Sequence, residues 1–140
     1  DMLGVKTYPS DYIDACEAAI GRQLDLHQRI ASKAAAAIEL AEYEQRLLAN
    51  LVLVLDHCFV HRLRTMEGKD GNPLNEVRML SASILEHGGV LTADNTIKYK
   101  PANAVLGLAI GDPIQLDPES FRRLADAFFT ELRAKFSATP

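Results

Sequence analysis

The chain has 140 residues, 48% of them hydrophobic and 24% charged, which is typical of a folded globular protein and excludes a largely disordered one. Its formal net charge of −4 disfavours nonspecific binding to nucleic acid or to an anionic membrane surface. This length is that of one ordinary domain, so we expect residues 1–140 to form a single domain.

The segment from Ser10 to Met66 has no proline and carries apolar residues in one continuous seven-residue phase. The pattern predicts one long helix or a tight helical hairpin over residues 10–66, and the unbroken phase favours a continuous helix. Asn50 is the best candidate for a break, because asparagine tolerates the left-handed conformation that ends helices. The apolar residues in phase are Ile13, Ile20, Leu24, Ala31, Ala34, Ile38, Ala41, Leu48, Val52, Leu55, Phe59 and Met66.

A continuous helix over this segment would be about 85 Å long, more than the diameter of a compact chain of this size. Its alanines between positions 31 and 41 are small enough for a second helix to approach closely. We therefore expect a homodimer, formed through the long helix across a two-fold axis. Between Leu47 and Val60 the segment is apolar on nearly every side, so we expect the rest of the chain to pack there.

The long segment should end at Glu67 and Gly68, because glycine is the usual residue after a helix. Asn72 and Pro73 suit the cap and the first position of a following helix, which we predict over residues 73–87. A pair of glycines at 88 and 89 ends it.

Residues 90–116 change character and alternate like strands on either side of a turn at Gly111 and Asp112, which predicts a small β-hairpin. The string from Thr96 to Leu116 resembles the strand, turn, glycine and strand of swapped-hairpin transcription factors of the AbrB type. The likeness covers one hairpin, and we infer no DNA binding from it.

The last element is a helix over residues 118–136, with Asp117 as its cap, Pro118 at its first position and apolar residues at helical spacing. The sequence thus predicts a mainly α fold. A long N-terminal helix or helical hairpin carries two shorter helices on its C-terminal part, and one small β-hairpin is added.

The densest group of polar side chains lies between positions 57 and 78. Arginines beside the free amides of a helix start can bind a phosphate or carboxylate, and two histidines four residues apart can chelate a divalent metal. The simpler interpretation is that these residues cap helices and pair charges. The candidate ligand or anion-binding residues are His57, His61, Arg62, Arg64, Asn72, Asn75, Glu76 and Arg78, and the candidate metal ligands are His57, His61, Glu67 and Glu76.

No catalytic residue can be assigned, because the chain lacks a glycine-rich phosphate loop, a GxSxG elbow and a paired CxxC motif. Two functions remain: a self-associating interaction or scaffold module, and a small-molecule, anion or metal site in the 57–78 region. Cys16 and Cys58 are far apart in the sequence, and we expect them to be reduced core residues of a cytoplasmic protein. The most apolar run, Leu47 to Leu55, is too short for a membrane span.

Overall fold

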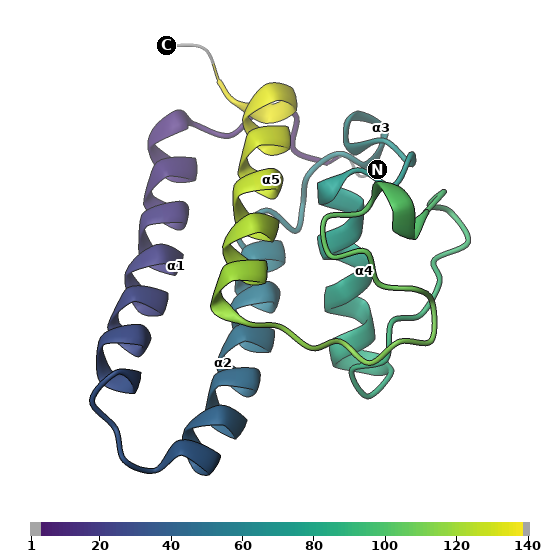
Figure 1. Cartoon of the computed structure of the whole chain (residues 1–140). Helices are drawn as coiled ribbons and strands as arrows, with labels where there is room; N and C mark the ends of the chain where they lie inside the picture. The colour runs from purple at the N-terminus through teal and green to yellow at the C-terminus, as the bar shows by residue number, and fades with distance from the viewer. Residues whose placement is uncertain (1–3, 139–140) are drawn as a thin grey trace.

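All regular structure in residues 4–138, which the computed structural model describes, is helical (Figure 1). None of the helices in this range is both long and apolar enough to cross a membrane. The elements in chain order are α1 (Ser10–Ala31), α2 (Ala37–His57), α3 (Arg64–Glu67), α4 (Pro73–Glu86), the 3-10 helix η1 (Pro101–Asn103) and α5 (Pro118–Phe136).

The long N-terminal segment is a helical hairpin in which α1 and α2 run antiparallel (Figure 1). The expectation of a continuous helix is wrong, and so is the placing of the break: Asn50 lies within α2, and the chain turns at Ser32–Ala36. The end of α1 tightens there, with Lys33 N–H donating to the Ile30 carbonyl and the Ser32 hydroxyl to the Arg29 carbonyl. Because the chain folds back at this turn, the two halves of the apolar stripe meet within one chain.

The second half of the hairpin also ends earlier than expected. α2 stops at His57, and the residues after it form turns in which Phe59 N–H donates to the Asp56 carbonyl. The one-turn helix α3 then covers only Arg64–Glu67. Phe59 is nevertheless fully buried, so the apolar phase continues past the end of the helix without requiring helical backbone.

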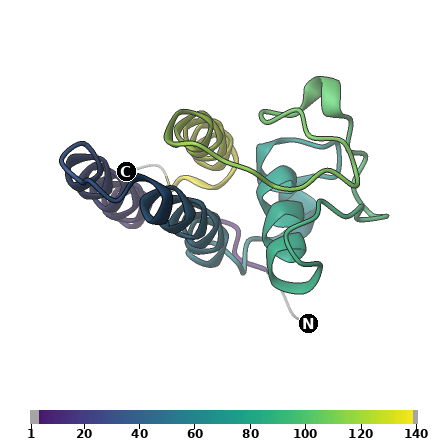
Figure 2. The same ribbon diagram turned by 60° about the horizontal axis from the view of Figure 1, so that its bottom comes forward.

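The helices α1, α2 and α4 lie side by side in one layer, with α2 in the middle (Figure 2). On one side of this layer lie α5, which contacts all three helices, and the irregular segment that leads to it. The core lies between the layer and α5, where Phe59 of the α2–α3 connection meets Phe128 and Phe129 with ring centroids 5.9 and 6.0 Å apart. The expectation of shorter helices packed on the N-terminal segment holds in its general form: α4 packs on α2, and α5 packs on both α1 and α2.

Both shorter helices begin at the caps that the sequence indicates. The Asn72 side chain accepts hydrogen bonds from the backbone of Leu74 and Asn75 at 2.9 and 3.2 Å, and Pro73 is the first helical residue. Asp117 forms a capping box with Ser120 at the start of α5. α5 spans the predicted residues 118–136, and α4 ends one residue before the predicted His87.

The predicted β-hairpin over residues 90–116 is wrong, because the described residues contain no strand and only an isolated bridge joins Val90 to Pro113. The two ends of the segment share backbone hydrogen bonds near Leu91 and Asp112, and the extended stretches between and after them bond to other parts of the chain. Lys98 N–H donates to the Lys69 carbonyl at 2.8 Å, and Gln45 on α2 hydrogen-bonds both the N–H and the carbonyl of Leu116. The likeness to the AbrB-type hairpin therefore does not extend to the structure.

We expect Phe59→Ala to lower the free energy of unfolding by about 3–5 kcal/mol, because it removes a fully buried ring from the centre of the core. The matched control is Ile38→Ala, which changes a side chain that is 83% exposed and should shift stability by no more than about 0.5 kcal/mol. Urea denaturation of both variants measures the difference. A loss below about 1 kcal/mol for Phe59→Ala would contradict this placement of the core.

Candidate functional site

The arginine at the centre of the 57–78 region, Arg62, is enclosed by the fold with 2% of its surface exposed. Its Nη1 donates to the Phe59 carbonyl at 2.9 Å, and its Nη2 donates to the Asp56 carboxylate at 3.0 Å and to the Leu74 carbonyl at 3.1 Å. Its Nε lies 2.9 Å from Oε1 of Glu67. The guanidinium thus joins the end of α2 to α3 and to the start of α4.

The partner of this arginine, Glu67, is fully buried as the last residue of α3. It accepts two hydrogen bonds from Arg78, at 3.1 and 2.6 Å, and one of 2.7 Å from the Asn75 amide. Burial alone raises the pKa of the Glu67 carboxyl, but the Arg78 hydrogen bonds and the positive charges of Arg62 and Arg78 outweigh burial and lower the pKa below its ordinary value. Glu67 therefore stays ionised inside the protein.

This geometry does not provide an open anion site. The charges of Arg62 and Arg78 are balanced within the fold by Asp56 and Glu67. Arg64 points elsewhere and donates to the Thr96 hydroxyl at 3.3 Å. The first amides of α4 are already occupied by the Asn72 side chain. The predicted residues are brought together, but their donors bind one another.

Glu76 is also buried, on the side of α4 that faces the irregular segment. Its two carboxylate oxygens accept the backbone N–H groups of Val105 and Leu106 at 2.8 and 2.9 Å. Burial raises the pKa of the Glu76 carboxyl, and these two backbone hydrogen bonds only partly offset that effect. Glu76 therefore holds the segment after η1 against α4.

The four candidate metal ligands are not brought together. His57 and His61 are exposed and line one recess of about 300 Å³, whereas the carboxylates of Glu67 and Glu76 are buried and engaged as described above. Across residues 4–138, no three histidine, cysteine, aspartate or glutamate side chains are arranged to hold a metal ion.

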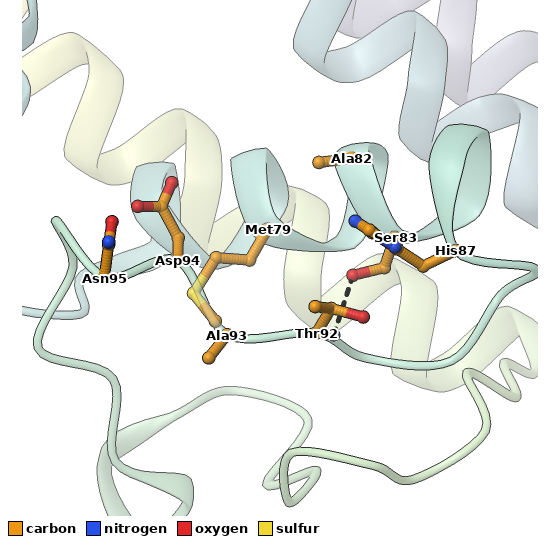
Figure 3. Close-up of a pocket in the computed structure, with 8 residues that line it drawn as sticks. All are labelled: Met79, Ala82, Ser83, His87, Thr92, Ala93, Asp94 and Asn95. Atoms are coloured by element: carbon orange, nitrogen blue, oxygen red, sulfur yellow. Dashed lines mark hydrogen bonds between the residues drawn. The ribbon is translucent and has the colours of Figure 1, made fainter.

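A polar recess of about 430 Å³ lies between α4 and residues 92–95 (Figure 3). Asp94 and His87 stand at opposite ends of it, with Met79 between them. Ser83 Oγ accepts the Thr92 N–H at 3.0 Å. The Asp94 carboxylate accepts two hydrogen bonds from Thr96, which lower the pKa of Asp94. These polar groups hold the loop and do not converge on one point.

The face of the α1–α2–α4 layer that points away from α5 is apolar and uncovered, and we call it the outer face. On α1, Asp14, Glu17 and Asp25 pair with arginines of α5. At about 100° per residue, the apolar stripe of α1 lies on the opposite side of the helix. The outer face comprises Tyr12, Ala15, Ala19, Leu26 and Ile30 of α1, Leu40, Tyr43, Leu47 and Val54 of α2, and Leu85 of α4.

Many of the large apolar side chains on the outer face are exposed to solvent. The described part of the chain has nine exposed large apolar side chains, and six of them lie here: Tyr12, Leu26, Ile30, Tyr43, Val54 and Leu85. Three adjoining recesses of about 460, 250 and 380 Å³ run along the face; the first two share Gln23 and the last two share Val54. A continuous apolar surface of this kind is typical of an interaction site.

The sequence interpretation missed this face, because it assigned burial to every side of residues 47–60. In the structure Leu48, Leu51 and Leu55 are buried, but Val54 is 44% exposed. A signal was present in α1, where positions 12, 16, 19, 23, 26 and 30 form a second stripe beside the buried Ile13, Ile20 and Leu24. Two adjacent stripes on one helix indicate two contact surfaces.

Comparison with models of protein families, with curated proteins and with solved structures gives no match for this chain.

We expect Glu67→Gln to destabilise the protein by about 3–5 kcal/mol, because it leaves the buried charges of Arg62 and Arg78 without their shared partner. The control is Glu42→Gln, which breaks an exposed pair with Arg46 and should cost no more than about 0.5 kcal/mol. Chemical denaturation at pH 7 compares the two. Equal losses of unfolding free energy in the two variants would show that the buried network contributes no more to stability than an exposed ion pair.

The same variant gives a pH prediction. The pKa of Glu67 is lower in the folded protein than its ordinary value of 4.5, so its ionisation stabilises the fold above pH 4.5 and this stabilisation is lost as the pH falls through the folded pKa. The difference in unfolding free energy between wild type and Glu67→Gln should therefore be constant at neutral pH and shrink below pH 4.5. A difference that grows on acidification would contradict the ion-paired state of Glu67.

Proposed function

We propose that this protein is a self-associating interaction module and that its outer face packs against the same face of a second copy. The observation that carries the proposal is the uncovered apolar surface of the helical hairpin, in which Ile30 is 66% and Tyr43 56% exposed. Burying such side chains contributes roughly 1.5–3 kcal/mol each, so a contact that covers several of them offsets a substantial cost of association.

The size of the face fits this role. α1 has 22 residues and, at about 1.5 Å per residue, is about 33 Å long. Two adjacent helices present a surface about 20 Å wide, so the hairpin offers on the order of 700 Å². Stable protein complexes bury about 800 Å² on each partner.

The charge distribution favours a second copy as the partner. The two recesses along the hairpin are lined by uncharged residues apart from His27, which is buried and contacts Glu44 at 3.1 Å. A two-fold contact places a patch against itself, so a patch without net charge meets no repulsion. Two antiparallel hairpins stacked in this way form a four-helix arrangement across the interface.

The alternative of an anion, small-molecule or metal site in the 57–78 region has no comparable support, because the groups that would bind a ligand are engaged within the chain. The net charge of the sequence disfavours nucleic-acid binding. A cytoplasmic location stays a prediction from the sequence.

The proposal is tested with Ile30→Glu, which places a charge within the outer face, and with the control Ile38→Glu, an 83% exposed position that lines none of the three recesses. Wild type should be a dimer at micromolar concentration. We expect Ile30→Glu to weaken association by about 100-fold or more, because a buried unpaired charge costs several kcal/mol, and Ile38→Glu to leave association unchanged. Analytical ultracentrifugation measures the association, and circular dichroism verifies that both variants stay helical.

Two results would overturn the proposal. One is a wild-type protein that remains monomeric at about 100 times the micromolar concentration at which a dimer of this interface area is expected. The other is equal loss of association in both variants, which would place the contact elsewhere than on the outer face.

A further inference from the structure

The two cysteines, far apart in the sequence, meet on the outer face. Cys16 of α1 and Cys58, the residue that follows α2, line the same recess of about 250 Å³, and both are half-buried. The Tyr12 hydroxyl donates to the Cys58 carbonyl at 2.7 Å, which fixes the end of α2 one helical turn from Cys16. Both cysteines are free thiols that pack against the core, and the structure adds that they line one recess.

The side chains of Cys16 and Cys58 are neighbours in this recess. Burial and, to a smaller extent, the neighbouring Cys16 side chain raise the pKa of Cys58 to about 11. Cys58 thus keeps its proton at neutral pH, and we assign the first attack on an oxidant to Cys16. Around the pair, Ala15 and Ala19 are exposed and too small to cover the sulfur atoms.

We propose that Cys16 and Cys58 form a reversible disulfide within one chain, and that a second copy seated on the outer face protects the pair from oxidation. The protection rests on the proposed function, because the partner would cover the recess that holds both sulfur atoms. The disulfide itself does not, since both cysteines belong to one chain. Disulfides in reducing compartments are usually transient and redox-sensing, which is the role this pair would have.

Hydrogen peroxide is a sufficient oxidant. The Cys16 sulfur attacks one peroxide oxygen, the O–O bond breaks, and the first water leaves with the Cys16 proton, so that Cys16 becomes a sulfenic acid. The Cys58 sulfur then attacks the Cys16 sulfur, the S–O bond breaks, and a second water leaves with the Cys58 proton. Two thiols are oxidised and one peroxide is reduced to two waters. A small dithiol reverses the bond by exchange.

The disulfide is tested on the Ile30→Glu variant, whose outer face should stay free. Treatment with hydrogen peroxide should lower the free thiols from two to none per chain, reduce the intact mass by about 2 Da, and leave a monomer on a non-reducing gel. Dithiothreitol should restore both thiols. The control Cys58→Ser should stop at a Cys16 sulfenic acid that dimedone traps. Persistence of both thiols, or a cross-linked dimer, would overturn the proposal.

Protection is tested on wild type at two concentrations. Where nine-tenths of the chains are dimers, oxidation should be about tenfold slower than in dilute protein, because only the free protomer reacts, and Ile30→Glu should show no such dependence. A dimer that oxidises as fast as free Ile30→Glu would overturn protection and leave the proposed function intact. A monomeric wild type that still forms the disulfide would overturn the proposed function and the protection that rests on it, but not the disulfide.

Discussion

The packing of α5 on the helical layer is the contact on which the rest of the structure depends. Its apolar side, including Phe121, Leu124 and Phe128, is at most 1% exposed and touches α1, α2 and α4 together. One helix of 19 residues covers one face of a three-helix layer and cannot reach the other. The buried core and the bare outer face therefore have one cause: within residues 4–138, the chain covers only one side of its helical layer (Figure 2).

The buried charges serve this architecture. Arg62 and Glu67 would be costly to bury alone, but each is surrounded by partners from neighbouring segments, so the network holds the end of α2, α3 and the start of α4 in one orientation. Glu76 does the same for the irregular segment, through two backbone amides. The polar residues of the 57–78 region, which in the sequence suggest a binding site, therefore hold neighbouring segments of the fold together. The surface left without a packing partner is the apolar outer face, which also holds the recess lined by Cys16 and Cys58.

The predictions that hold depend on local chemistry. The caps at Asn72 and Asp117 and the prolines after them act within one helical turn, so the starts of α4 and α5 can be derived from a few residues. The predictions that fail depend on distant partners. The stretch after His87 alternates like strands, but its two ends pair with each other only near Leu91 and Asp112, and other parts of its backbone bond to Lys69, Gln45 and Glu76. The candidate site divides in the same way: the sequence groups the polar residues of the 57–78 region and cannot tell that they neutralise one another.

The sequence by itself determines that the chain is mainly helical, where α4 and α5 begin, and that its first helical segment carries an apolar stripe too long to remain uncovered. These features follow from residue spacing and capping, which act over a few positions. Only the tertiary structure decides that the stripe folds back at Ser32–Ala36, that one face of the resulting layer stays bare, and that Cys16 meets Cys58. Those outcomes depend on which surfaces are covered after all helices have packed, and burial is a property of the whole chain.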